Sequence, residues 1–318
     1  MPQSAPSSAQ RDHGGNLDAA ITQYGGSRRD WLDLSTGINP TPYPLSTLAP
    51  SDWTDLPDAA AQSGLADAAR SFWQVPQAAS ILPAPGASAL IARLPGLAAI
   101  GRVRITPPTY NEHAAAFAAA GWSVTDTGKA DARVLVHPNN PDGRLFCADD
   151  VSAPLTIIDE SFCDVMPDKS LIAEATRPGV VILKSFGKFW GLAGLRLGFA
   201  IAHPATIAPL RDMLGPWSVS GPALRIGTQA LCDSDWAAKT RLALAEARTR
   251  LDRAMTGAGA EIRGGTDLFG LYQVEDAALW QDRLARAHVW TRIFPYSRTL
   301  IRLGLPSSDH WAKLETAL

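Results

Sequence analysis

The sequence predicts an α/β protein that has a large domain with a mostly parallel sheet flanked by helices, plus a smaller α+β domain. From about residue 65, short apolar runs alternate with helical periods, which is typical of a mainly parallel sheet. Each run is short and mostly apolar, as expected of a strand buried on both faces. After Pro216 this alternation stops, and 318 residues are enough for two domains.

Six short apolar runs predict the strands of the large sheet, and two longer periodic runs predict helices between them. Most of these strands end in a polar or glycine-rich loop, and open α/β sheets bind ligands at such carboxyl-end loops. The strands are expected over residues 78–82, 102–105, 132–136, 155–158, 180–183 and 197–201, and the helices over 89–100 and 110–121.

The last third of the chain predicts the smaller domain. Gly215-Pro216 is a natural break, and a long helix should end at Gly257. Helices are expected over residues 221–232, 236–256 and 276–287, and strands over 261–263, 268–274, 290–294 and 300–303. The predicted limits are 1–44 for an N-terminal arm that also contributes to the small domain, 45–215 for the large domain and 216–318 for the small domain.

Composition excludes several classes of function. Lys and Arg number 29 against 31 Asp and Glu, a net charge of −2, so no basic excess indicates nucleic acid or a membrane surface. No apolar stretch approaches the roughly 20 residues that cross a bilayer. Residues 1–12 read as a frayed tail rather than a signal peptide. Three cysteines without metal-ligand spacing favour a reducing compartment. We therefore expect a cytoplasmic protein with a small ligand and no bound metal.

The most informative stretch runs from Lys184 to Gly198 and contains Lys188 directly after an apolar strand. Ser185 lies three residues before this lysine and Arg196 eight after it, among glycines that allow backbone to approach a ligand closely. A partly desolvated lysine near another cation has a lowered pKa, and only the neutral amine attacks a carbonyl. The pattern predicts a Schiff-base lysine, with Ser185 and Arg196 placed to bind a phosphate.

Further elements follow in chain order. Gly86-Ala87-Ser88 opens a helix, where backbone amides and a hydroxyl can hold a phosphate. Tyr110 follows Thr106-Pro107-Pro108-Thr109, and Asn140 lies in His137-Pro138-Asn139-Asn140-Pro141-Asp142-Gly143. Asp159 ends the apolar run 155–158, from which a carboxylate can project toward a ligand, and a buried carboxylate needs a cationic partner.

Together these motifs resemble the fold-type I pyridoxal-phosphate enzymes, the aspartate-aminotransferase-like superfamily. The resemblance implies that Lys188 carries pyridoxal 5′-phosphate and that Ser185 and Arg196 bind its phosphate. It also implies that Tyr110 stacks on the pyridine ring, that Asn140 binds the ring oxygen O3′, and that Asp159 pairs with the protonated ring nitrogen. The implied cofactor-binding set is Gly86, Ala87, Ser88, Tyr110, Asn140, Asp159, Ser185, Lys188 and Arg196, of which Lys188, Asp159, Asn140 and Tyr110 are also the implied catalytic residues.

Two positions depart from the superfamily pattern. Phe162 stands where relatives have a tyrosine that donates a hydrogen bond to O3′, so one contact that tunes the cofactor is missing. Leu56, in Leu56-Pro57-Asp58, stands where many relatives have a tyrosine that reaches the cofactor phosphate of the partner subunit.

Terminal segments indicate a branch of this superfamily. His13-Gly14-Gly15-Asn16 and the segment 32–40 resemble the amino-terminal signature of the threonine-phosphate decarboxylases of cobalamin synthesis, and segments 291–295 and 301–306 resemble their C-terminal part. The implied reaction is decarboxylation of L-threonine O-3-phosphate to (R)-1-amino-2-propanol O-2-phosphate. The expected substrate-binding residues are His13, Ser35, Thr36, Gly37, Asn39, Arg292 and Arg302, because arginine binds phosphate or carboxylate through two parallel bonds.

Two rival functions stay open. A histidinol-phosphate aminotransferase shares the fold, the cofactor and a phosphorylated amine substrate, but the His-Gly-Gly-Asn opening, Phe162 and Leu56 count against it. A non-catalytic regulator that senses pyridoxal phosphate would carry an amino-terminal DNA-binding domain, and the segment before residue 65 shows no basic recognition helix. The resemblance also implies a homodimer with active sites at the subunit interface.

Overall fold

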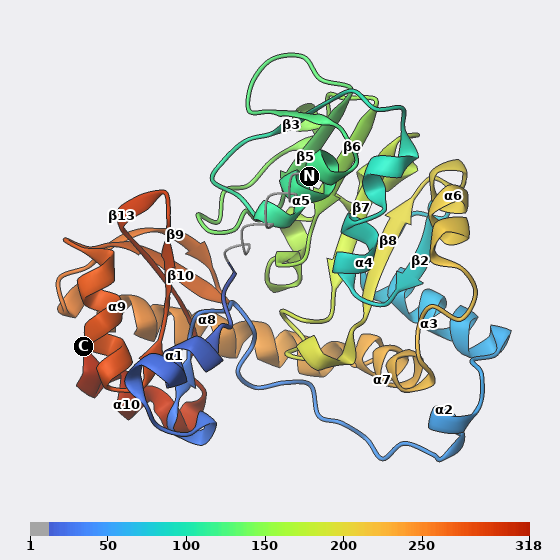
Figure 1. Ribbon diagram of the computed structural model, residues 1–318. Coiled ribbons are helices and arrows are strands. Elements are labelled where there is room, and N and C mark those ends of the chain that lie inside the picture. The colour runs from blue at the N-terminus through green and yellow to red at the C-terminus, as the bar shows by residue number, and fades with distance from the viewer. Residues whose placement is uncertain (1–12) are drawn as a thin grey trace, which may run out of the picture.

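The computed structural model describes residues 13–318, and it contains a large domain and a smaller domain joined by a long helix (Figure 1). The predicted frayed tail, residues 1–12, lies outside the described residues. The large domain is built on a seven-stranded sheet with the order β2-β8-β7-β6-β5-β3-β4. Its strands are β2 Ser80–Ala84, β3 Arg102–Ile105, β4 Ser123–Thr125, β5 Ala132–Val136, β6 Leu155–Asp159, β7 Val180–Ser185 and β8 Gly198–Ala202.

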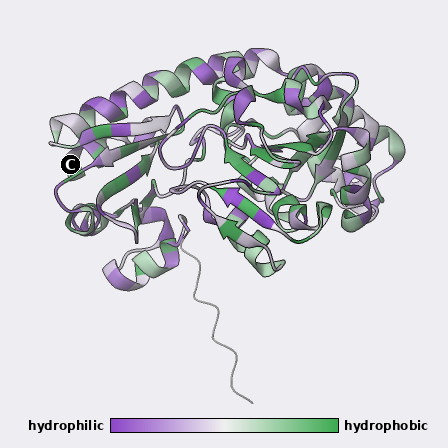
Figure 2. Cartoon of the chain, turned by 90° about the horizontal axis from the view of Figure 1, so that it is seen from above, coloured by the Kyte–Doolittle hydropathy of each residue, from purple (hydrophilic) through white to green (hydrophobic). Residues whose placement is uncertain are grey.

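The sheet is mostly parallel, which confirms the predicted fold class. Neighbours from β4 to β7 run parallel, and only β8 runs antiparallel to its neighbours β7 and β2. Both faces of the sheet are covered: Ile157 belongs to one hydrophobic core and Ile158 to the other. Continuous apolar strands therefore appear in the sequence, and Figure 2 shows the strands at the centre of the large domain as mainly hydrophobic.

Helices that precede, connect and follow the strands pack on these two faces. On one face lie α3 (Ala59–Phe72) and α7 (Gly221–Leu231), which contribute Leu65 and Leu224 to the core. The other face is covered by α4 (Ala87–Ile91), α5 (Asn111–Ala119) and α6 (Pro204–Leu214). This arrangement leaves the carboxyl ends of the parallel strands available for a site.

The smaller domain contains a four-stranded antiparallel sheet with the order β12-β13-β10-β9. The long helix α8 (Ser234–Gly257) runs from the large domain to this sheet and packs on β9 and β10 (Figure 1). The strands are β9 Glu261–Thr266, β10 Phe269–Gln273, β12 Arg292–Phe294 and β13 Ser297–Gly304, and the other helices are α9 Ala277–Arg286 and α10 Trp311–Ala317.

The N-terminal segment lies against the smaller domain. Helix α1 (Leu17–Tyr24) packs on α9, and β1 (Leu32–Asp33) pairs in parallel with β11 (Val289–Trp290). The short helix α2 (Ser51–Thr54) follows before α3. The domain limits 1–44, 45–215 and 216–318 stay a prediction.

Two local expectations from the sequence differ from the structure, and one strand was not expected. The helix expected over 89–100 ends at Ile91 and is followed by a 3-10 turn over Leu94–Leu97, because Pro95 has no N–H to continue the helix. The strand expected over 290–294 is two strands, β11 and β12, which pair with different partners on either side of Thr291. The edge strand β4 has three residues and gives no clear period in the sequence. Within residues 13–318, no helix combines the length and the apolar character needed to span a membrane.

Candidate active site

The predicted site residues of the large domain meet at the carboxyl edge of the parallel strands. Asp159 is the last residue of β6, Ser185 is the last residue of β7, and Asn140 lies in the loop after β5. A cavity of about 130 Å³ lies at this edge. Among the residues that line it are Ala87, Ser88, Tyr110, Asn140, Asp159, Ser185, Lys188 and Arg196.

Lys188 lies in the loop after β7 and lines both this cavity and a wider one of about 710 Å³. Its Nζ is 5.2 Å from the ring centroid of Phe162. Removal from bulk water lowers the pKa of Lys188, the charge of Arg302 lowers it further, and Asp159 only partly opposes this, so that the pKa falls to about 8. At pH 7 about a tenth of Lys188 is therefore a neutral, nucleophilic amine, far more than for an ordinary lysine, and this is the form that a Schiff-base lysine requires.

Asp159 is buried and stays ionised. Burial raises the pKa of Asp159, but the hydrogen bond and charge of His113 and two hydrogen bonds from Ser161 outweigh burial and lower it. The distance from Asp159 Oδ2 to His113 Nε2 is 2.8 Å, and Asp159 Oδ1 accepts bonds from the Ser161 amide at 3.0 Å and its hydroxyl at 2.5 Å. The carboxylate can thus carry a negative charge deep in the site.

His113 is a site residue that the sequence analysis missed. Its side chain is fully buried on α5, three residues after Tyr110, and its Nδ1 has no hydrogen-bond partner among the described residues. The only signal in the sequence is a single histidine in an alanine-rich helix, and such a residue is more often part of a core than of a site. Its role follows from the packing of α5 against the end of β6, which the sequence does not show.

The predicted phosphate site is formed by close backbone packing. A Cβ atom at Gly86 would lie 2.5 Å from Arg196 Nη2, and Gly86 has a φ of +86°, so a side chain there would be both strained and obstructed. A Cβ at Gly198 would likewise overlap the amide nitrogen of Ala87. Helix α4 has only five residues, so its dipole is weak. This segment would therefore bind a phosphate through its backbone amides and the Ser88 hydroxyl.

These donors fit pyridoxal phosphate. Amide, hydroxyl and guanidinium groups of Ala87, Ser88, Ser185 and Arg196 are the chemistry that binds a phosphate. Asp159 supplies the buried anion for a protonated ring nitrogen, and Tyr110 supplies an aromatic wall in the same cavity.

The wider cavity joins the two domains and the N-terminal segment. Lys188 opens into it together with His13, Thr36, Gly37, Arg292 and Arg302 from the predicted substrate set. Arg292 and Arg302 are directly opposite each other on β12 and β13. Like charges placed opposite each other destabilise a sheet, and an anion bound beside the pair would offset this repulsion.

Arg302 is the more deeply buried of the two arginines. Burial, followed by the charge of Arg292, lowers the pKa of Arg302 to about 10. Its Nη2 donates to the Ser35 carbonyl oxygen at 2.6 Å, and its Nη1 donates to Asn140 Oδ1. Its Nε has no hydrogen-bond partner among the described residues, so the guanidinium retains a donor for a ligand.

Other members of the predicted substrate set contact protein instead. Ser35 is buried, and its hydroxyl bonds to Asp33 and to the Gly15 amide. The Asn39 side chain donates to the Phe189 carbonyl at 2.8 Å, and its backbone amide donates to the Lys188 carbonyl at 3.0 Å. Neither residue lines the wider cavity; Asn39 instead holds the backbone of the Lys188 loop.

His13 and the two departures from the superfamily pattern have defined surroundings. His13 Nε2 lies 2.9 Å from Glu112 Oε1 at the edge of the wider cavity. Phe162 packs edge-on against Phe269, with ring centroids 5.1 Å apart, in the space beside Gly37. Leu56 is exposed and lines neither of these two cavities.

Comparisons with known proteins show the family of the chain. Residues 123–311 match the family model for aminotransferases of class I and II. A threonine-phosphate decarboxylase from Sinorhizobium sp is 42% identical over 92% of this chain and 92% of its own length. A threonine-phosphate decarboxylase from Pseudomonas aeruginosa is 38% identical over 96% of this chain and 97% of its own.

A solved structure has the same fold. The histidinol-phosphate aminotransferase of Sinorhizobium meliloti, in complex with pyridoxal-5′-phosphate, superposes with a TM-score of 0.81 at 20% identity, covering 99% of this chain and 95% of that one. This likeness confirms the predicted fold-type I architecture. The chain belongs to the aminotransferase class I and II family and, within it, to the group of the threonine-phosphate decarboxylases.

Proposed function

We propose that this chain catalyses the pyridoxal-phosphate-dependent decarboxylation of L-threonine O-3-phosphate to (R)-1-amino-2-propanol O-2-phosphate, a precursor of the cobalamin nucleotide loop. The observation that carries the proposal is the arginine pair: Arg292 and Arg302 lie side by side in one cavity with Lys188. Two anion sites beside a nucleophilic lysine suit an amino acid with both a carboxylate and a phosphate. The reaction is the one for which the two relatives of 42% and 38% identity are named.

The large-domain residues would hold the cofactor. Lys188 would bear it covalently, Ser88, Ser185, Arg196 and the amides of residues 86–88 would hold its phosphate, and Asp159 would pair with its ring nitrogen. Tyr110 would stack on the ring and Asn140 would bind O3′. When bound, pyridoxal phosphate supplies a conjugated ring that accepts the electron pair left as the carboxyl group departs.

The arginine pair and His13 would bind and orient the substrate. Arg292 and Arg302 neutralise its two anionic groups, and the cavity around them is partly shielded from bulk water, which strengthens both contacts. By holding the carboxylate and the phosphate, they would orient the substrate so that the bond to its carboxyl group is the one that the cofactor activates, as a decarboxylase requires.

Lys188 would then move the proton that completes the reaction. Once CO2 has left, the α-carbon needs a proton, and the Lys188 amine, with a pKa of about 8, can carry one near neutral pH. Asp159 remains ionised throughout, because His113 and Ser161 hold its carboxylate.

A second copy of the chain would complete the site. Ser88 and Arg196 are exposed in the single chain, so the predicted phosphate site is open to solvent on one side. Trp53 and Leu56, both apolar, are 70% and 68% exposed in the segment before α3. A homodimer that covers these surfaces would close the phosphate site. The cytoplasm is the compartment proposed for this enzyme, because it keeps Cys147, Cys163 and Cys232 reduced.

The test is a paired assay with the purified protein and added pyridoxal phosphate. Threonine phosphate should release CO2, whereas histidinol phosphate with 2-oxoglutarate should yield no glutamate. Glutamate without CO2 would support the transaminase instead. The wild type should gain a visible absorption band with pyridoxal phosphate, and Lys188→Ala should not. A wild type that gains no such band would favour a function outside this chemistry.

A further inference from the structure

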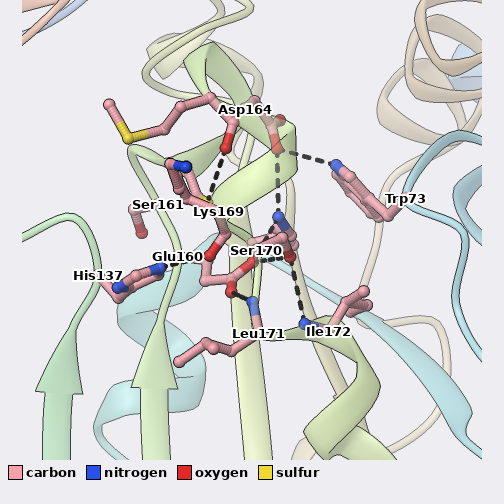
Figure 3. A network of polar contacts seen from close by, with 12 residues as sticks. Trp73, His137, Glu160, Ser161, Asp164, Lys169, Ser170, Leu171 and Ile172 are labelled. Atoms are coloured by element: carbon pink, nitrogen blue, oxygen red, sulfur yellow. Dashed lines mark hydrogen bonds and ion pairs between the residues drawn. The ribbon is translucent and has the colours of Figure 1, made fainter. Parts of the chain in front are cut away.

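A buried cluster of charges, part of which Figure 3 shows, contacts the Lys188 loop through Asp164, and its residues line neither of the two cavities. Lys184, Glu160 and Asp164 are at most 4% exposed. Lys184 Nζ lies 2.7 Å from Glu160 Oε2 and 3.4 Å from Asp164 Oδ1. The two carboxylates raise the pKa of Lys184 despite its burial, so this lysine is a fixed cation whereas Lys188, four residues later, is not.

Each carboxylate is fully engaged by the protein. Glu160 accepts bonds from the Leu171 amide and the Ser170 hydroxyl, both at 2.6 Å, and Figure 3 shows its side chain pointing toward these residues. His137 and Cys163 lie close enough to Glu160 to suggest a metal cluster, but both nitrogens of His137 already have partners in Lys169 and Phe146. The cluster is therefore an internal ion network.

Asp164 connects this network to the Lys188 loop. Its Oδ2 accepts a bond from Trp190 Nε1 at 3.2 Å, and its Oδ1 accepts one from Trp73 Nε1 at 2.9 Å. Trp190 lies two residues after Lys188, is fully buried, and stacks on Phe186 and Trp236 with interplanar angles of 11° and 12°.

The loop is fixed through both its backbone and a side chain. The Asn39 amide donates to the Lys188 carbonyl, and the Tyr43 amide donates to the Trp190 carbonyl at 2.9 Å. The Asp164 carboxylate accepts a hydrogen bond from the Trp190 side chain. Because Glu160 follows Asp159 directly, the same network also ties the end of β6, which bears the buried carboxylate, to β7, which leads to Lys188.

We infer that Asp164, fixed by Lys184 and Glu160, is a positioning residue that sets the place of Lys188 relative to Asp159 through its hydrogen bond to Trp190. Since this effect concerns the cofactor lysine, the inference rests on the proposed function. The inference predicts that removal of the hydrogen bond between Trp190 and Asp164, which lies outside the cavities, changes the pH midpoint and the turnover measured at Lys188. If Trp190 were only structural, its replacement would change only the stability of the protein.

The experiment compares Trp190→Phe with two matched variants in the full-length protein carrying pyridoxal phosphate. Trp73→Phe removes the other tryptophan bond to Asp164 but lies outside the Lys188 loop. Trp236→Phe replaces a tryptophan by phenylalanine in the same aromatic stack as Trp190. The Trp236 indole has no hydrogen bond to Asp164 among the described residues, so none is lost. For each, the pH midpoint of the visible absorption band, kcat, KM for threonine phosphate and the melting temperature are measured.

Trp190→Phe should shift the pH midpoint by about half a unit or more and lower kcat about tenfold with KM nearly unchanged, because small misplacements of reacting groups are costly. Trp236→Phe and Trp73→Phe should retain the wild-type midpoint and kcat even if they melt earlier. If Trp190→Phe does not fold, the isosteric Asp164→Asn is expected to show the same shift. A wild-type midpoint and kcat in the folded variant, or equal effects in Trp190→Phe and Trp236→Phe, would overturn the inference. A wild type without the visible band would instead refute the proposed function, and the inference with it.

Discussion

Replacing Lys188 by methionine should stabilise the cofactor-free protein at neutral pH. The folded chain lowers the pKa of Lys188 from 10.5 to about 8, so that below pH 8 it holds a charged lysine in an unfavourable place. One pKa unit corresponds to about 1.4 kcal/mol, so the full cost is about 3 kcal/mol. Water that enters through the open cavity reduces this cost, and we expect a gain in the free energy of unfolding of about 2 kcal/mol for Lys188→Met.

The pH dependence of this gain has a definite direction. Between pH 8 and 10.5 the unfolded chain still binds the proton that folded Lys188 has released, so the stability of the wild type rises with pH in this range. The advantage of Lys188→Met is therefore complete below pH 8 and disappears as the pH approaches 10.5.

Denaturant unfolding of the cofactor-free proteins at pH 7 and pH 9.5 measures both effects. Replacement of the exposed Lys129 by methionine serves as the control and should show no such dependence on pH. If Lys188→Met is no more stable than the wild type at pH 7, or if its advantage is the same at both pH values, then the reasoning about the buried amine is wrong.

Three further outcomes follow from the site. Arg302→Gln should lower kcat/KM for threonine phosphate by about 100-fold or more, since a charge-assisted contact is lost; steady-state kinetics measure this, and a change below tenfold would argue against Arg302 as an anion ligand. Gly86→Ala should weaken binding of pyridoxal phosphate, because the new Cβ would lie 2.5 Å from Arg196 Nη2, and equilibrium dialysis with unchanged affinity would contradict this. Phe162→Tyr should lower the pH midpoint of the visible band by restoring a donor toward O3′, and an unchanged midpoint in a spectroscopic titration would show that the hydroxyl does not reach it.

The sequence predicted those parts of the site in which a few neighbouring residues form a complete pattern. Lys188, Asp159 and Asn140 each follow a short apolar strand, and parallel strands bring their carboxyl ends to one edge, so their meeting could be expected. Arg302 and Arg292 were expected to bind anions, but their direct opposition depends on the register between β12 and β13.

The remaining features depend on packing between distant segments. His113 is a site residue only because α5 lies against the end of β6, and Asn39 holds the Lys188 loop only because residues 39–43 cross it. The ion network of Lys184 and Asp164 is likewise invisible in the sequence, where the two residues are 20 positions apart. The early end of the helix expected over 89–100 was missed because the apolar period continues past Pro95, although proline cannot continue the helix.

The most direct test of the proposed function follows the carboxyl carbon itself. The protein with pyridoxal phosphate is given threonine phosphate labelled with ¹³C in the carboxyl group, in D₂O, and the products are followed by NMR. We predict that labelled CO2 and aminopropanol phosphate form in equal amounts, with one deuterium at the former α-carbon. Loss of the amino group with the label retained in an oxo acid would contradict the account.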